Sequence, residues 1–395
     1  MDSPRKYKKK NKHNKKGEDK GKEKNEDKIV ENLLKIHNFK YDSILGKGGF
    51  GNVFSIYVND NNFAFKVVKL NKNVKDNEDK THSSNTIKLI ETEFSYAKML
   101  RSKYCIRTLS IYKDENDKLF KNLIIYSAVM DKASYSDLKY FVYYFYKGNL
   151  LHLNNNHNFP FNKNINIMII RFFAYQMIQS LDFLFSHNLC HCDFKSENFL
   201  ICYGFNLKIS DFSLIKIIEK NKNVKLTSST WNIRPLEYFT KNKEVSSEDA
   251  IKIDIYGFGL ILYYMIFHEH LLNNNDDKDK LTKKELSREN KYKHLQEQII
   301  KKRQKIKDSN IEKGLKDLIL SSIELFPSKR PNVKDLLENN WINEDMDILK
   351  QIYNINDYEE IKLFIEFQKF KKNDNIKKRK RRKNNFYYND NKNKV

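Results

Sequence analysis

The stretch 191–213 holds the side chains whose types and spacing could do chemistry. Two carboxylates, Asp193 and Asp211, stand toward its two ends, with Lys195 and Asn198 shortly after the first. Apolar residues on both sides of a turn predict two short strands, and such a hairpin would bring Asp211 back beside Asn198. Carboxylate and amide oxygens in one pocket suit Mg²⁺ that is shared with substrate phosphates. A solvated polar loop is the alternative for any one of these residues, but the spacing of all four argues against it.

A glycine-rich segment lies far upstream of this stretch. Gly46, Gly48 and Gly51 follow the pattern G-x-G-x-x-G, which dinucleotide-binding folds also contain. A dinucleotide fingerprint must open a helix, whereas the residues from Val53 to Tyr57 are typical of a strand. The sequence therefore predicts a glycine-rich hairpin, whose backbone N–H groups can approach phosphates closely. The phosphate-loop pattern that ends in Gly-Lys-Ser/Thr is absent.

The next predicted strand, over 62–69, carries Lys66 in its middle. A lysine inside an apolar strand is costly without an anionic partner, so we expect Lys66 to contact a phosphate and a carboxylate. A helix predicted over 86–100 offers two such carboxylates, Glu91 and Glu93. The helical pattern alone leaves both open.

Length, charge and cysteine content limit the class of protein. The 395 residues suffice for one large domain or two ordinary ones. Much of the net charge of +23 lies at the two ends, and residues 1–38 are expected to form a disordered basic arm. Four cysteines without a CxxC pair argue against a disulfide framework or a structural zinc. A start without an apolar signal segment favours an intracellular location, nuclear or cytoplasmic.

Hydrophobic patterns place the remaining elements. They predict a buried strand over 123–130 and a long apolar helix over 165–187. The apolar run 255–267 is too short to span a bilayer, so we expect a buried helix there and no transmembrane segment. The charged stretch 272–310 is expected to be partly helical and solvated, and two amphipathic helical patterns follow within 311–342.

Taken together, these segments resemble the eukaryotic protein kinase family, of the Ser/Thr type, over residues 39–343. The resemblance implies an α+β fold with two lobes. A small, mainly β N-lobe over about 39–130 would be joined by a hinge, 131–137, to a larger, mainly helical C-lobe over 138–343, with ATP and Mg²⁺ in the cleft. Residues 344–395 would then be a C-terminal extension, helical at first and ending in a polybasic disordered tail.

The resemblance assigns a set of residues to the ATP site. In this set Lys66, positioned by Glu93 rather than Glu91, would neutralise the phosphates. The backbone of Ala133 would contact adenine, and Asp137 would reach toward the ribose. The residues that would line the ATP site are Leu45, Gly46, Gly48, Gly51, Val53, Ala64, Lys66, Met130, Asp131, Ala133, Asp137 and Leu200.

The resemblance also implies catalytic roles. Asp193 would accept the proton of the substrate hydroxyl as catalytic base. Lys195 would stabilise the transferring γ-phosphoryl group, while Asn198 and Asp211 would hold Mg²⁺ on the phosphates. Thr230 would face the substrate, and this threonine together with a lysine two residues after the catalytic aspartate resembles Ser/Thr kinases rather than tyrosine kinases.

Three further residues have structural counterparts in the family. Asp254 resembles the helix aspartate that braces the catalytic loop. Glu237 closes the activation segment in the sequence Pro-Leu-Glu, where the family has Ala-Pro-Glu. Arg330 resembles the partner of Glu237.

Other departures from the family concern regulation. Cys192, in the sequence His-Cys-Asp, replaces an arginine that commonly reads a phosphate on the activation segment. We therefore hypothesise that phosphorylation within 227–230 is not needed in the usual way. Ser213, in Asp-Phe-Ser, replaces a glycine that can let this turn flip. Ala97 is smaller than the residue the family usually has four positions after the glutamate.

The basic run Lys377–Lys383 is typical of nuclear import signals and nucleic-acid patches. A solvated disordered tail explains it equally well, because blocks of like charge are disordered by themselves. Expected partners are thus a protein substrate and a nuclear import receptor at this run, with nucleic acid as the weaker alternative.

The sequence as a whole predicts a Ser/Thr protein kinase that transfers the γ-phosphoryl group of Mg-ATP to a protein hydroxyl. A pseudokinase or scaffold that binds nucleotide or a partner without transfer is one alternative, and a nucleic-acid-binding protein is another. The substrate is left open, because Asp137 and Glu197 favour basic residues before the acceptor, whereas Arg234 resembles a position found in proline-directed kinases.

Overall fold

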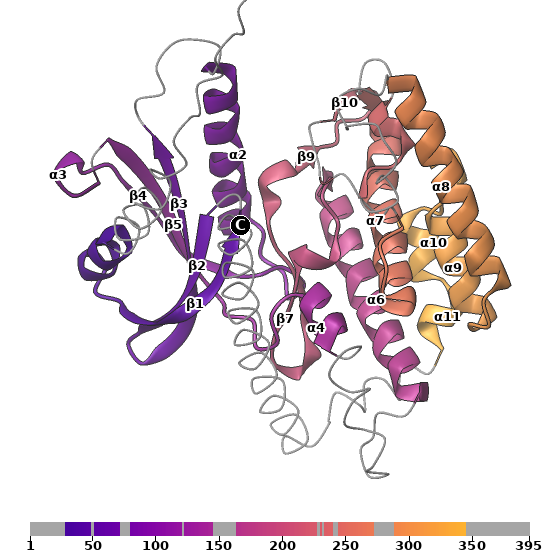
Figure 1. The fold of residues 1–395 in the computed structure, drawn as a ribbon, viewed down its shortest axis with the longest axis horizontal. Helices are drawn as coiled ribbons and strands as arrows, with labels where there is room; N and C mark the ends of the chain where they lie inside the picture. Colours follow the sequence, from indigo (N-terminus) through magenta and orange to yellow (C-terminus); the bar gives the residue numbers. More distant parts are fainter. Residues whose placement is uncertain are drawn as a thin grey trace, which may run out of the picture. The chain divides into compact units, whose positions relative to one another are not determined.

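A computed structural model describes residues 28–48, 51–71, 80–120, 122–144, 163–226, 230, 233–239, 244–271 and 288–344. Internal contacts divide the chain into two compact units, whose elements are labelled in Figure 1. The first unit comprises Met1–Lys88 and Thr108–Lys132, and the second comprises Leu89–Arg107 and Ala133–Val395. One boundary between the units thus falls inside the predicted hinge, between Lys132 and Ala133.

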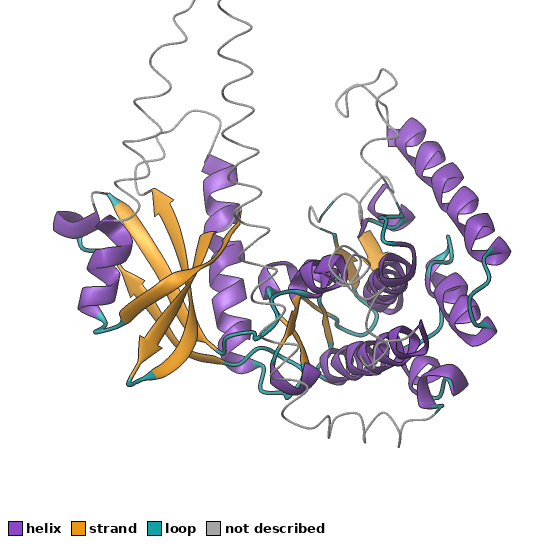
Figure 2. Ribbon diagram, turned by 60° about the horizontal axis from the view of Figure 1, so that its bottom comes forward, coloured by secondary structure: helices purple, strands orange, loops and turns teal. Residues whose placement is uncertain are grey.

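The first unit is built on one antiparallel sheet, shown in orange in Figure 2. Its strand order is β1-β2-β3-β5-β4. The short helix α3 (Asp117–Phe120) lies in the connection between the last two strands in sequence. The strands are β1 (Lys40–Gly48), β2 (Gly51–Val58), β3 (Asn61–Asn71), β4 (Thr108–Asp114) and β5 (Leu123–Met130).

The glycine-rich segment forms the predicted hairpin. β1 pairs with β2, and Gly48 lies opposite Gly51 at the closed end. Because the glycines join two strands and open no helix, they are not a dinucleotide fingerprint. Gly51 has φ +143°, and a Cβ there would lie 2.3 Å from the carbonyl oxygen of Val67, so this position requires glycine.

Residues 28–36 form a helix, so the expectation of a disordered arm up to residue 38 is wrong for this segment. The buried face of this helix packs against the sheet. Apolar side chains of the sheet, such as Phe65, belong to the same hydrophobic cluster as the helix. Burial of these side chains stabilises a segment that is too short to be helical in isolation. The helix residues in the cluster are Ile29, Val30, Leu33 and Leu34.

Helix α2 (Lys80–Met99) starts earlier than the predicted residue 86. Residues 72–79 lie outside the described part of the chain. Ile90, Phe94 and Ala97 are buried and form the inward face of the helix. Glu93 lies on the same buried side, while Glu91 is exposed.

The second unit is mainly helical. The predicted long helix over 165–187 and the predicted amphipathic helices within 311–342 are confirmed. The helices are α4 (Leu138–Tyr144), α6 (Lys163–Ser186), α7 (Ser247–Phe267), α8 (Arg288–Asp308), α9 (Lys313–Ser322), α10 (Val333–Leu337) and α11 (Asn340–Asn343).

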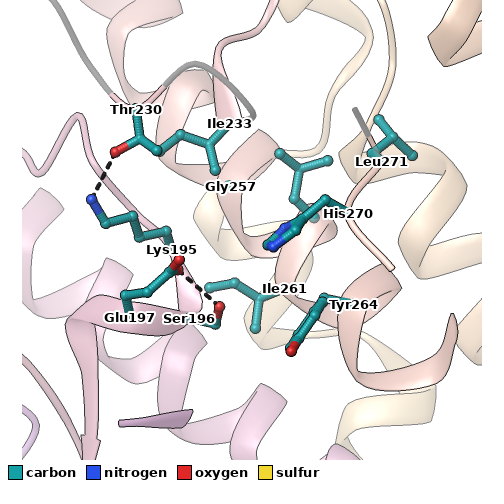
Figure 3. A pocket seen from close by; sticks show the side chains of 11 residues that line it. Lys195, Ser196, Glu197, Thr230, Ile233, Gly257, Ile261, Tyr264, His270 and Leu271 are labelled. Carbon is teal, nitrogen blue, oxygen red and sulfur yellow. Dashed lines mark hydrogen bonds between the residues drawn. The ribbon is translucent and has the colours of Figure 1, made fainter. Parts of the chain in front are cut away.

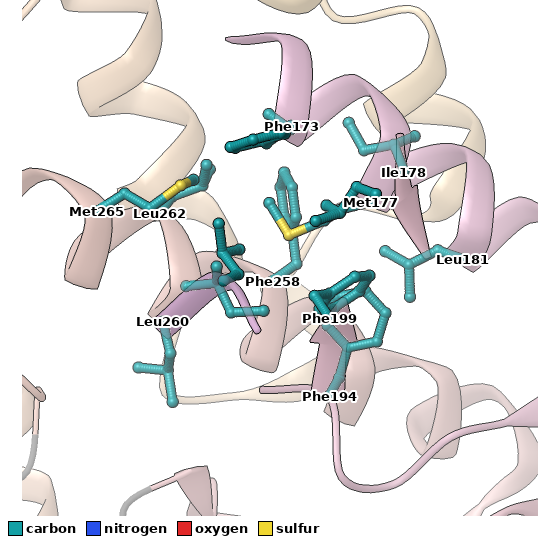
Figure 4. Packing of buried hydrophobic residues seen from close by; sticks show 14 of the residues in the cluster. Phe173, Met177, Ile178, Leu181, Phe194, Phe199, Phe258, Leu260, Leu262 and Met265 are labelled. Carbon is teal, nitrogen blue, oxygen red and sulfur yellow. The ribbon is translucent and has the colours of Figure 1, made fainter. Parts of the chain in front are cut away.

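Helix α7 is the central element of this unit's core. In length and composition it could cross a membrane, and it is the one helix of the described residues that could, but 72% of its most apolar window is buried. Figure 4 shows Phe258 and Leu262 of α7 in one cluster with Met177 of α6 and with Phe199. The prediction of a buried helix is confirmed.

The charged stretch 272–310, predicted to be partly helical and solvated, contains helix α8, but one face of this helix is buried rather than solvated. The buried side chains Leu295, Ile299 and Ile306 fix α8 to the core of the second unit. Residues 272–287 lie outside the described part of the chain. The same holds for residues 145–162 and for 345–395, which include the basic run predicted to bind an import receptor.

Glu269, just after α7, forms the centre of an ion-pair network with α8. Its carboxylate accepts hydrogen bonds from the Tyr263 hydroxyl, from Lys302 Nζ at 2.9 Å and from Lys305 Nζ at 2.8 Å. Burial alone would raise the pKa of Glu269, but the hydrogen bonds from Lys305, Tyr263 and Lys302 lower it to about 2. The ionised carboxylate therefore joins α7 to α8.

We predict that Glu269→Gln lowers the free energy of unfolding at pH 7 by about 1 kcal/mol, since it removes a charge network. The folded-state pKa is depressed, so this stabilisation is present above the ordinary carboxyl pKa and is lost as pH falls toward 2. Urea unfolding of both proteins at pH 7 and at pH 3.5 should thus give a smaller difference at the lower pH. Glu289→Gln, which breaks an exposed pair with Lys293, is the control, and an equal effect of both variants would contradict the prediction.

Candidate active site

The predicted hairpin is present in the second unit. β7 (Phe199–Ile201) pairs with β8 (Leu207–Ile209) in the register Phe199↔Ile209. The backbone N–H and the hydroxyl of Ser210 both donate to the carbonyl oxygen of Asn198, at 2.8 and 2.9 Å. Asp211 is the next residue, so the hairpin returns this carboxylate to Asn198 as predicted.

Asp193 is buried and is held by side chains from three other positions. Its Oδ2 accepts from Lys195 Nζ at 2.5 Å and from Asn198 Nδ2 at 3.1 Å. Its Oδ1 accepts from the hydroxyl of Thr230 at 3.0 Å. Lys195 also donates to the Thr230 hydroxyl oxygen at 2.7 Å, which Figure 3 shows as a dashed line. The carboxylate is thus in hydrogen-bond contact with a cation and an alcohol.

Asn198 ends the short 3₁₀ helix η2 (Ser196–Asn198). Its amide nitrogen donates to the backbone carbonyl of Asp193 at 2.8 Å as well as to the carboxylate. Both bonds use the nitrogen, so the amide oxygen is the atom that could ligate a cation.

Asp211 has a left-handed backbone, with φ 64° and ψ 74°. Apart from glycine, mainly asparagine and aspartate adopt this conformation, and it is often found at functional sites. Its Oδ1 accepts from the Ser213 hydroxyl at 2.7 Å and from the Ser213 backbone N–H at 3.4 Å. Ser213, where the family has glycine, therefore adds a hydrogen bond that orients the Asp211 carboxylate.

The donor set of Asn198 and Asp211 fits Mg²⁺ better than a metal with protein ligands alone. In the described residues, no group of three or more His, Cys, Asp or Glu side chains gathers as a metal site. A cation here would take its remaining ligands from phosphate and water, which is how proteins commonly bind Mg²⁺ together with a nucleotide.

Asp254 of α7 holds the backbone of the two residues that precede Asp193 in the sequence. This side chain is almost fully buried, and its two oxygens accept the backbone N–H groups of His191 at 2.5 Å and Cys192 at 2.8 Å. Burial raises the pKa of Asp254, and the charge of His191 and these hydrogen bonds oppose that shift. The predicted bracing role of Asp254 is confirmed.

The sulfur of Cys192 lies in an apolar environment. Cys192 belongs to a buried cluster with Cys190, Leu214 and Ile218. Its sulfur lies 3.3 Å from that of Cys190, whose S–H donates to the carbonyl oxygen of Ala250 at 2.9 Å. Cys192 therefore lacks the guanidinium that commonly binds a phosphate at this position, and its side chain packs among apolar residues.

The predicted pairing of Glu237 with Arg330 is confirmed. The two form a bidentate ion pair, with Nη1–Oε1 at 2.6 Å and Nη2–Oε2 at 3.0 Å. Both side chains are buried. Arg330 also donates to the carbonyl oxygens of Glu324 and Lys252, at 2.9 and 3.0 Å. This pair therefore fixes the 3₁₀ helix η6 (Leu236–Phe239) to the segment before α10.

The predicted ATP-site residues are divided between the two units. Within the first unit, pairing of the strands places Val53 opposite Lys66 and Ala64 opposite Met130. The predicted residues of this unit are Leu45, Gly46, Gly48, Gly51, Val53, Ala64, Lys66, Met130 and Asp131.

Two of the predicted ATP-site residues of the second unit, Asp137 and Leu200, lie at the hairpin. Asp137 forms a bridge with Leu200, and its carboxylate accepts the backbone N–H of Tyr140 at 2.9 Å at the start of α4. Ala133 and Glu93 also belong to this unit. The pairing of Lys66 with Glu93 stays a prediction.

Two contacts at the site were not expected from the sequence. Lys139 Nζ donates to Glu197 Oε1 at 2.7 Å, and no local pattern signals a pair so far apart in the chain. The bond from Ser213 to Asp211 had a signal, because an aspartate side chain in a tight turn often bonds to the backbone two residues later.

Comparison with known proteins identifies the family. The model of the protein kinase domain matches residues 39–342, and this chain belongs to that family. The first unit with its β-sheet and the mainly helical second unit confirm the predicted α+β, two-lobed kinase fold.

Several kinases are similar to this chain at low identity. An Aurora kinase of Eremothecium gossypii is 24% identical over 79% of this chain and 71% of its own length. A probable serine/threonine-protein kinase, CST, of Arabidopsis thaliana is 24% identical over 76% of this chain and 67% of its own length. A probable serine/threonine-protein kinase, PLK, of Dictyostelium discoideum is 22% identical over 78% of this chain and 26% of its own length.

We predict that Glu237→Gln lowers the free energy of unfolding by about 3–5 kcal/mol, because it leaves the buried guanidinium of Arg330 without a counter-charge. Denaturant unfolding of the full chain measures this difference. Glu338→Gln is the matched control, since it breaks an exposed pair with Lys334 and should change stability by less than about 0.5 kcal/mol. Similar small effects for both variants would refute the structural role of the pair.

Proposed function

We propose that this protein is an active Ser/Thr protein kinase, which transfers the γ-phosphoryl group of Mg-ATP to a protein hydroxyl. The observation that carries the proposal is the Asp193 carboxylate, held by Lys195 and Asn198 and bonded to the hydroxyl of Thr230. A carboxylate that already accepts from one hydroxyl at 3.0 Å can orient a second, incoming hydroxyl.

Each residue of the loop has a chemical role in this proposal. Asp193 orients the substrate hydroxyl and accepts its proton as the bond to phosphorus forms. Lys195, one of whose N–H groups binds Asp193, neutralises charge on the transferring group. Asn198 and Asp211 would hold Mg²⁺, which when bound offsets the charge of the phosphates. Lys66 would contact the phosphates from the first unit.

The Ser/Thr class is supported by the contacts of Lys195 and Thr230. The Thr230 hydroxyl connects Lys195 to Asp193 and so fixes the segment that faces the substrate beside the catalytic loop. The relatives named above as serine/threonine-protein kinases support the same class.

A pseudokinase is the alternative that shares this fold. The presence of Lys66, Asp193, Asn198 and Asp211 argues against it, because loss of any one of them would remove a step of the proposed reaction.

We predict that Asp193→Asn lowers the rate of phosphoryl transfer by about 10²–10⁴-fold, the usual contribution of a general base. Transfer from radiolabelled Mg-ATP to a generic protein substrate, by the full chain, measures the rate. Nucleotide binding by the variant is the control and should be retained. If the wild-type chain binds nucleotide but transfers no phosphate, or if both proteins transfer equally, the proposal fails.

We further propose that the activation segment needs no phosphate. Cys192 stands where a phosphate-reading arginine is common, and it is buried among apolar side chains with Leu214 and Ile218. An apolar cluster cannot compensate the charge of a phosphate, so phosphorylation would gain no binding energy at this position. Thr227 and Ser229 lie outside the described residues.

Thr227→Ala and Ser229→Ala should therefore keep the wild-type rate of phosphoryl transfer in the same assay. Thr230→Ala is the contrasting variant, and its rate should fall because the hydroxyl binds both Asp193 and Lys195. The proposal would be wrong if Thr227→Ala or Ser229→Ala were inactive and an acidic residue at the same position restored activity.

A further inference from the structure

A hollow in the second unit adjoins the contacts between Asp193, Lys195 and Thr230 (Figure 3). It holds about 380 Å³ of empty space, part of which is open solvent. Lys195 and Thr230 line one side, and Tyr264 and His270 lie on the other side in the figure. The hollow therefore begins where the substrate hydroxyl must lie to reach Asp193.

Aliphatic side chains form much of its wall. Ile233 follows Thr230 in the activation segment, while Leu260 and Ile261 come from α7. Leu271 is a further aliphatic residue of the wall. Contact with these side chains would favour an apolar group, because its burial removes apolar surface from water.

The acidic group of the hollow already has a cation. Glu197 Oε1 accepts from Lys139 Nζ at 2.7 Å, and its other oxygen accepts from the Ser196 hydroxyl at 3.1 Å. Burial would raise the pKa of Glu197, but the hydrogen bond and the charge of Lys139 lower it. Glu197 is therefore ionised and paired at a partly exposed position, and a basic substrate side chain would have to displace Lys139.

The two polar groups at the far side are uncharged near pH 7. Burial raises the pKa of Tyr264 to about 12, so its hydroxyl stays protonated. Burial and the charge of Lys139 lower the pKa of His270 below its ordinary value. Both can form hydrogen bonds, but neither offers a charge to an incoming lysine or arginine.

We propose that this hollow binds a substrate side chain one or two positions from the acceptor hydroxyl, and that it selects an aliphatic or aromatic side chain over a basic one. The inference rests on the proposed kinase function and extends it to substrate choice. In an extended peptide the Cα atoms of adjacent residues lie about 3.8 Å apart, so a neighbour of the acceptor can reach the hollow. A cation there would lose water without gaining a free carboxylate.

The pair of Lys139 with Glu197 also removes one of the hints in the sequence, the one that came from Glu197. Glu197 alone would favour a basic residue in the substrate. Because Lys139 takes that place, the selection at this hollow falls to the aliphatic wall.

A position-scanning peptide array phosphorylated by the full chain tests the inference. At one position beside the acceptor, the wild type should prefer Leu, Ile or Phe to Arg. Lys139→Gln should raise the rate with Arg at that position, relative to Leu, by about threefold, since it leaves Glu197 to the incoming guanidinium. The double variant Lys139→Gln/Glu197→Gln should return to the wild-type preference.

Ile233→Ala gives a second, independent measurement, because it shortens the wall without changing charge. It should lower the rate with Leu or Phe at the same position relative to Ala. The inference is overturned if the wild type prefers Arg at each neighbouring position, or if transfer occurs but neither Lys139→Gln nor Ile233→Ala changes any preference. Absence of transfer to every peptide would instead overturn the proposed kinase function, and the inference with it.

Discussion

The buried carboxylate of Asp254 is the constraint on which the site depends. The loop that carries Asp193 has an irregular backbone, with φ 61° at Cys192, so no regular ladder can satisfy its N–H groups. Asp254 accepts two of them from the middle of the largely buried helix α7. An unsatisfied N–H group in such a place would cost about 1–3 kcal/mol. These two bonds fix the loop to the core of the second unit. The backbone that carries Asp193 is therefore held in place as well.

The other residues of the site come from distant parts of the chain. Close packing and ion pairs hold them beside the loop. A Cβ at Gly257 of α7 would lie 2.3 Å from the carbonyl oxygen of Phe194, so helix and loop meet backbone to backbone. Thr230 returns to Asp193 from the activation segment, whose end is fixed by the Glu237–Arg330 pair. The buried carboxylates of Asp193 and Glu237 are each paired with a cation, Lys195 and Arg330, as low-dielectric surroundings require. The result is a loop whose carboxylate is already oriented before a substrate arrives.

The sequence predicted what depends on local pattern. The strand over 123–130, the hairpin after Asn198 and the helix over 165–187 follow from the spacing of apolar residues along a few turns or strands. The helix over 28–36 was missed because its apolar face is stable only against a sheet formed later in the chain. A contact between side chains far apart in the chain, such as that of Lys139 with Glu197, leaves no pattern in the sequence that could predict it. The pair of Glu237 with Arg330 is equally remote, and it was predicted only through the family resemblance.

Replacement of Asp254 by asparagine tests most directly whether this carboxylate positions the loop for phosphoryl transfer. The amide group would place a donor against a backbone N–H group of the loop, with little change in volume. We expect the rate of transfer to fall about a hundredfold, the free energy of unfolding to fall by about 1–3 kcal/mol, and nucleotide affinity to change little. Glu248→Gln, at an exposed position of the same helix, should leave all three unchanged. An Asp254→Asn protein that transfers phosphate at the wild-type rate would contradict the account.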